Sequence, residues 1–148
     1  LVVLRPGDLP ALYDPATYLK AVAAFETAGQ HEVARLGYQA ALKRSPEQPV
    51  ALFGLANSLL AGGEEEQAIE EYRKLLAIEP GHAAAVNNLA EALARLGCRS
   101  QALALLDRTL APAAGGGPFR PTLLQTRAEI AARRQEAGAG GGCPATPE

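Results

Sequence analysis

The stretch PVALFGLANSLLAGGEEEQAIEEYRKLLAIEPGH, residues 49–82, decides the fold of this 148-residue chain. Its marks recur 34 positions earlier and later, as a glycine, an alanine and a proline. They are Gly29, Gly63 and Gly97, then Ala34, Ala68 and Ala102, and the prolines Pro46 and Pro80. A repeat of this length is typical of helix–turn–helix units that stack on copies of themselves. The sequence therefore predicts an all-α solenoid.

Each recurring residue has a local physical reason. The glycines follow a helix end, where a left-handed backbone is easiest without a β-carbon. The alanines are small residues, expected where the two helices of a unit approach most closely. The prolines cannot donate the backbone hydrogen bond that a continuing helix needs. The chain is therefore expected to turn into the next unit at each proline.

These marks divide the chain into units. Three repeats are predicted at residues 15–48, 49–82 and 83–114, each with an apolar stripe on both of its helices. A glycine run, 115–117, precedes a seventh helix predicted over 118–135. Its apolar side (Phe119, Leu123, Ile130, Ala131) should cover the last unit, and its polar side should face water.

The pattern resembles the tetratricopeptide repeat over about residues 15–114. The resemblance implies a right-handed α-solenoid of three helix pairs plus a capping helix, and a role in binding proteins or peptides. Two departures stand out. Val22 replaces the small residue that the family prefers, which predicts wider helix packing in the first unit, and the third unit lacks the late proline.

In such solenoids the first helix of each unit lines a concave groove. Counting inward positions from the unit starts gives the predicted peptide-binding residues: Leu19, Ala23, Phe53, Asn57, Leu60, Asn87 and Glu91. Leu19, Phe53 and Leu60 would serve as apolar anchors, and the amides and the carboxylate as polar contacts. Alternatives remain open at this stage. A structural role also explains Asn57, packing between units also explains Phe53, and Asn87 and Glu91 can be read as ordinary solvated polar residues.

The composition excludes several function classes. A formal net charge of −2 offers no basic surplus for nucleic acid, and no apolar run approaches the length of a membrane span. No side chains are spaced as a metal site or as a nucleophile with its base. We therefore expect a non-enzymatic domain without cofactor, bound to a protein or peptide partner. Self-association, or packing on an upstream domain, is the alternative.

The two edges of the chain carry separate expectations. Residues 1–14, beginning Leu-Val-Val-Leu, are predicted to be a linker or the last strand of a preceding domain, and the absence of methionine suggests a piece of a longer protein. Residues 136–148 are predicted to be a disordered tail, which argues against a disulfide between Cys98 and Cys143.

The edge sequences also resemble the C-terminal part of bacterial papain-like (C39-type) cysteine peptidases. The resembling segments are LVVLRPGDLP at the start and GGGPFR with AEIAARR near the end. In that family a tetratricopeptide module follows the peptidase domain. The resemblance implies an appendage of a larger bacterial protein, located in the cell envelope, with the catalytic residues upstream of Leu1.

Overall fold

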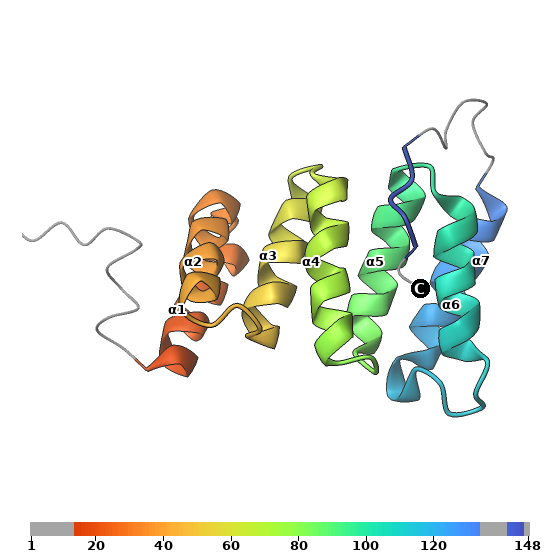
Figure 1. Ribbon diagram of the computed structural model, residues 1–148, viewed down its shortest axis with the longest axis horizontal. Coiled ribbons are helices and arrows are strands. Elements are labelled where there is room, and N and C mark those ends of the chain that lie inside the picture. Colours follow the sequence, from red (N-terminus) through yellow and green to blue (C-terminus); the bar gives the residue numbers. More distant parts are fainter. Residues whose placement is uncertain (1–13, 134–141, 147–148) are drawn as a thin grey trace, which may run out of the picture.

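The computed structural model describes residues 14–133 and 142–146, and these contain α-helices and no strand. The α-helices are α1 (Pro15–Thr27), α2 (His31–Arg44), α3 (Pro49–Ala61), α4 (Glu65–Ile78), α5 (Ala83–Arg95), α6 (Arg99–Leu110) and α7 (Arg120–Ala132). A short 3-10 turn, η2 (Gly117–Phe119), leads into α7. Figure 1 shows the helices stacked in chain order along one axis. The predicted all-α solenoid is confirmed, while the strand expected near residues 1–4 lies outside the described residues.

The first helix of every unit begins at a side-chain cap. An oxygen of Asp14 accepts hydrogen bonds from the backbone N–H groups of residues 16 and 17, and Gln48 Oε1 accepts one from residue 51. His82 Nδ1 likewise accepts a hydrogen bond from the backbone N–H of residue 85. These caps satisfy N–H groups that have no partner inside the helix. Positions 14, 48 and 82 are 34 residues apart, so the capping residues also follow the repeat, although the three residues differ.

The same helices end at the predicted glycines. Gly29, Gly63 and Gly97 have φ angles of 77°, 76° and 85°, in the left-handed region. The residue after each glycine donates a backbone hydrogen bond to a carbonyl five positions back, as from Cys98 to Leu93 at 2.7 Å. This geometry closes the helix and turns the chain. The role predicted for the glycines is confirmed.

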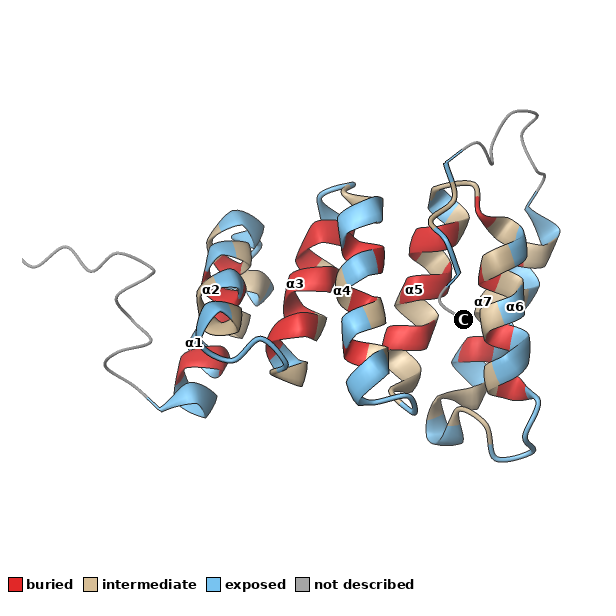
Figure 2. Cartoon of the chain, in the orientation of Figure 1, coloured by how far each residue is buried: buried red, intermediate tan, exposed pale blue. Residues whose placement is uncertain are grey.

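The buried apolar residues form one cluster, and Figure 2 shows buried segments along all the stacked helices. The recurring alanines Ala34, Ala68 and Ala102 are fully buried, as expected for the closest contacts between helices. The middle helix α3 has eight buried residues, because it packs against α2 and α4 and also contacts α1 and α5. The core is therefore continuous, and each unit depends on its neighbours for burial.

The first unit accommodates Val22 through a glycine on the facing helix. A β-carbon at Gly37 of α2 would lie 2.7 and 2.9 Å from the two γ-carbons of Val22. The missing side chain at Gly37 therefore makes room for the larger one at Val22. The carbonyl of Gly37 also accepts a hydrogen bond of 2.8 Å from the Tyr18 hydroxyl. Gly37 thus provides room for Val22 that the prediction of wider packing in the first unit did not consider.

The C-terminal end departs from the sequence expectation. Cys98 and Cys143 form a disulfide, with their Cα atoms 5.6 Å apart, and Gln101 Nε2 donates a 3.0 Å hydrogen bond to the carbonyl of Pro144. The prediction of a disordered tail without a disulfide is therefore wrong for residues 142–146. The physical reason is that α7 packs back along α5 and α6, so a segment following it can return to the α5–α6 turn.

Candidate functional site

A cavity of about 490 Å³ lies between α3, α5 and α7. Four of the seven predicted residues line it: Asn57, Leu60, Asn87 and Glu91. Ala61, Asn88 and Arg95 come from the same two helices, and Thr126, Glu129 and Arg133 come from α7 or its end. The repeat spacing thus brings residues of units two and three to one place, and α7 supplies a wall.

The other three predicted residues lie elsewhere. Leu19 is buried and lines a separate cavity of about 300 Å³ with residues from α1 and the α2–α3 turn. Ala23 is half-buried on α1. The half-buried ring of Phe53 packs 4.9 Å from His82 and 6.3 Å from Tyr72, measured between ring centroids. Phe53 therefore joins α3 to the helix and loop that follow, which is the packing role left open by the sequence.

Asn57, in the wall of the cavity, connects α3 to α4 and α5 by hydrogen bonds. Its Oδ1 accepts a 2.6 Å hydrogen bond from the hydroxyl of Tyr72 on α4 and a 3.0 Å bond from Asn88 Nδ2 on α5. Burial raises the pKa of Tyr72, so the hydroxyl keeps its proton and acts as a donor. Asn57 Nδ2 makes no hydrogen bond within the part of the chain that the structure describes, so this donor is left for a ligand.

Asn87 connects the groove to α7. Its Oδ1 accepts a 2.7 Å hydrogen bond from the Thr126 hydroxyl, and its Nδ2 lies 3.4 Å from Asn88 Oδ1. The side chains of Asn87 and Thr126 are both half-buried. The first bond spans the interface between the third unit and the helix that covers it, and therefore sets where α7 sits relative to the cavity.

Glu91 forms the charged part of the site. Its carboxylate is bound by Arg95 Nε at 3.2 Å and by Arg133 Nη2 at 3.0 Å. Burial by itself would raise the pKa of Glu91, but the hydrogen bonds and positive charges of the two guanidinium groups outweigh it and hold the pKa below its ordinary value. Glu91 is therefore ionised at neutral pH, and its charge is already balanced by the protein.

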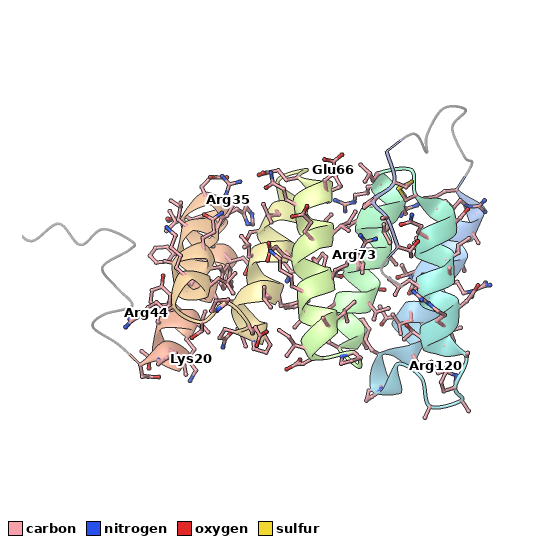
Figure 3. All side chains as sticks on the ribbon, viewed as in Figure 1. Lys20, Arg35, Arg44, Glu66, Arg73 and Arg120 are labelled. Carbon is pink, nitrogen blue, oxygen red and sulfur yellow. A yellow bond between two sulfur atoms is a disulfide. The ribbon has the colours of Figure 1, made fainter. Side chains whose placement is uncertain are left out.

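The contribution of α7 to the site was missed by sequence reasoning, which expected its polar side to face water. Gln125, Glu129 and Arg133 are exposed as expected, but Thr126 and Arg133 also contact Asn87 and Glu91. Arg120 turns toward the loop before it and donates to three backbone carbonyls, at Leu110, Pro112 and Gly115 (Figure 3). The available signal was the seven-residue spacing of Thr126 and Arg133, which places them on one side of a helix.

The chemistry of the cavity is that of recognition. Amides, carboxylates, guanidinium groups and the Thr126 hydroxyl surround the aliphatic side chain of Leu60, and no Cys or His lies among the lining residues. Among residues 14–133 and 142–146 there is no group of three or more His, Cys, Asp or Glu side chains that could hold a metal ion. In the same residues no helix has the length and apolarity of a membrane span.

Two models of tetratricopeptide-repeat families match the chain, one over residues 19–82 and the other over residues 59–118. The tetratricopeptide repeat and J domain-containing co-chaperone DNJ1 of Fusarium oxysporum is 32% identical over 94 residues, or 64% of this chain. A probable biofilm formation methyltransferase, WspC of Pseudomonas aeruginosa, is 31% identical over 106 residues, or 72% of this chain. The chain spans only 18% and 25% of the lengths of these curated relatives.

Solved structures share the architecture. The TPR2B domain of yeast Sti1, solved as a complex with pHsp70, has a TM-score of 0.73 at 20% identity and covers 81% of this chain and 98% of that domain. A thermophilic tetratricopeptide-repeat protein of Thermus thermophilus has a TM-score of 0.67 at 26% identity, covering 80% of this chain and 65% of that one. These structures show the fold, and the two family models, which together cover residues 19–118, show that the chain belongs to the tetratricopeptide-repeat family.

Proposed function

We propose that this domain is a protein-interaction module that binds a peptide segment or a partner helix in the cavity between α3, α5 and α7. The observation that carries the proposal is the cavity itself, about 490 Å³ in volume and lined by the two first helices α3 and α5 and by α7. Similar domains occur in a co-chaperone and in a complex with pHsp70, which supports a partner of protein nature.

The contacts in the cavity indicate what a ligand would meet. Leu60, only 9% exposed, offers a small apolar surface, and the Nδ2 group of Asn57 offers a hydrogen-bond donor for a main-chain carbonyl. Glu91 is already neutralised by Arg95 and Arg133. A strongly charged ligand therefore gains little here, and a largely neutral segment with one aliphatic anchor fits best.

The proposal is tested with Ala61→Arg, which places a long charged side chain at an exposed residue on the rim of the cavity. Peptides selected from a displayed random library on the purified chain serve as the probe. Their affinity for Ala61→Arg, measured by fluorescence titration, is expected to fall at least about tenfold, which corresponds to about 1.4 kcal/mol.

Ala104→Arg is the matched control, because Ala104 is also an exposed helical alanine and lies on α6, outside the lining of the cavity. It should leave the affinity unchanged. Peptides that bind Ala61→Arg as well as the wild type would contradict the proposed location. If the library yields no binder and sedimentation shows concentration-dependent association of the chain, the alternative function of self-association is favoured.

We also propose, on the edge resemblance alone, that the module recruits partners for a preceding C39-type peptidase domain. The support is confined to the segments quoted from residues 1–10 and 115–134. The sequence encoded upstream of Leu1 decides this point. An adjacent domain without a paired cysteine and histidine would contradict it, and the binding proposal would stand independently.

A further inference from the structure

A groove with a mainly apolar lining lies on the side of α5 opposite the candidate site. Leu89 and Leu93 point into it, while Asn87 and Glu91, two positions away along the same helix, line the first cavity. Leu76 of α4 and Leu105 of α6 complete its apolar lining, and its volume is about 460 Å³. Ala145 and Thr146 of the C-terminal segment form part of its wall. Figure 1 shows this segment crossing α5 between α4 and α6.

The segment 142–146 is held in place mainly by one covalent bond. The disulfide joins Cys143 to Cys98, which is buried at the start of α6 (Figure 3). The hydrogen bond from Gln101 Nε2 to the carbonyl of Pro144 is the sole side-chain hydrogen bond to it among the described residues. The other polar atom of that amide, Gln101 Oε1, is buried without a partner. Covering the groove therefore leaves an acceptor unsatisfied, an unfavourable contribution that water would relieve on opening.

We propose that residues 142–146 form a redox-controlled strap that covers the apolar groove while the disulfide is intact and leaves it when the disulfide is reduced. In the oxidised protein this segment forms one wall of the groove and closes it on that side. The strap fits the groove through small side chains, Ala145 and Thr146, and makes few polar contacts. Without the covalent bond, little opposes the gain in chain entropy on release.

The opening step is an exchange with a dithiol reductant. One thiolate of the reductant attacks the sulfur of Cys143, the more exposed of the two, and the Cys98 sulfur leaves as a thiolate that takes up a proton. Cys98 is the residue that precedes α6, so its thiolate forms near the positive end of the helix dipole. The second thiolate then releases the Cys143 sulfur, which is protonated, and the reductant becomes a cyclic disulfide. Two electrons and two protons pass to the protein.

Opening changes the surface of the domain. The leucine side chains at 76, 89, 93 and 105 would gain contact with water, beside Arg73 and Arg108 at the same groove. Burial lowers the pKa of Arg73, whose guanidinium group would also become better hydrated. The oxidised form thus shields an apolar surface that the reduced form presents, on a face separate from the proposed peptide site.

The test compares the full chain before and after reduction with dithiothreitol, using the fluorescence of an apolar dye such as anilinonaphthalene sulfonate. Reduction is expected to raise the dye signal of the wild type to the level of the Cys143→Ser variant. That variant should show the raised signal with and without reductant, because it cannot form the disulfide that holds the strap. Far-UV circular dichroism, recorded in parallel, should remain unchanged.

A chain ending at residue 133 provides the reference signal for an uncovered groove. A dye signal that stays low in the reduced wild type would overturn the proposal, because the strap would then stay in the groove without its bond. Loss of helical signal on reduction would also overturn it, since the disulfide would then be a structural requirement of the fold. Equal dye signals for the reduced wild type, the Cys143→Ser variant and the shortened chain, with helices intact, are the result expected.

Discussion

The two ends of the solenoid bury the same repeat position to very different extents. Leu59 and Leu93 are each 3% exposed, whereas Phe25, one repeat earlier, is 38% exposed. Leu93 shares its groove with side chains of α4, the helix before its own. Among residues 14–133 no helix precedes α1, so Phe25 has no such neighbour. The burial of a repeat position therefore depends on the adjacent unit more than on the residue that occupies it.

The C-terminal end, by contrast, is covered by α7 and cross-linked by a disulfide. Leu123 and Ile130 of α7 are fully buried against the third unit, and the disulfide links the segment beyond α7 to the start of α6. At the N-terminal end, within residues 14–133, α1 packs on α2 and α3, and these helices bury Tyr18 and Val22. We therefore expect the N-terminal unit to open first and the C-terminal units to open last.

Removing the disulfide should have the largest effect on this difference. Cys143→Ser opens a loop that joins residues 45 apart, and the free energy of unfolding is expected to fall by up to about 3–4 kcal/mol, because the unfolded chain gains more entropy than the folded chain gains from release of the strap. Urea unfolding monitored by circular dichroism measures it. Reduced wild type should match the variant. A change below about 1 kcal/mol would mean that the bond constrains the unfolded chain less than its span suggests.

The compensation inside the first unit gives the next largest effect. Gly37→Ala should destabilise the wild type by about 1–2 kcal/mol, because its β-carbon meets the γ-carbons of Val22. In a Val22→Ala background the same change should be neutral or stabilising by up to about 1 kcal/mol, since alanine favours a helix. A double-mutant cycle from urea unfolding checks this.

Gly81→Ala is the matched control for this cycle, because a β-carbon there meets no atom within 4 Å. It should change stability by less than about 0.5 kcal/mol in either background. Equal costs of Gly37→Ala with and without Val22 would show that the two residues are independent.

The attachment of α7 through the groove should contribute less. Thr126→Val removes the hydroxyl that donates to Asn87, and we expect a loss of about 1 kcal/mol. Thr122→Val, at an exposed residue of the same helix, should have no measurable effect. Amide hydrogen exchange of α7 would show whether this bond limits local opening at the C-terminal end. A common effect of both variants would reflect helix propensity instead.

The pH dependence of the Glu91 ion pairs should be the smallest effect. The pKa of Glu91 is below its ordinary value of 4.5, so the folded state binds its proton less readily than the unfolded state. Its contribution is fully present above the unfolded pKa and is lost as the pH falls through the folded pKa. Because the pair is partly exposed, we expect less than about 1 kcal/mol.

Urea unfolding of the wild type and of Glu91→Gln at pH 7 and pH 3 measures this contribution. The wild type should be the more stable of the two at pH 7, and the difference should shrink at pH 3. A difference of the same size at both pH values would show that Glu91 acts through packing, since an ion-pair contribution must decline as the pH falls toward the folded pKa.

Much of the fold could be predicted because it is encoded in local patterns. Gly63, Ala68 and Pro80 mark the end of one helix, the contact with the next and the end of the unit, and each acts within its own repeat. The candidate site was predictable only in part. Asn57 and Asn87 were found by their register on first helices, but Thr126 and Arg133 reach the cavity through the packing of α7, which no repeat pattern specifies.

The sequence by itself determined the helices, their turns and the stacking order, since these follow from hydrophobic periodicity, glycine conformation and proline geometry at fixed spacing. Only the tertiary structure decided that Gly37 accommodates Val22, that α7 forms a wall of the cavity and that Cys143 returns to Cys98. Those features join residues through space, and their energies depend on side chains that meet only after the units have stacked.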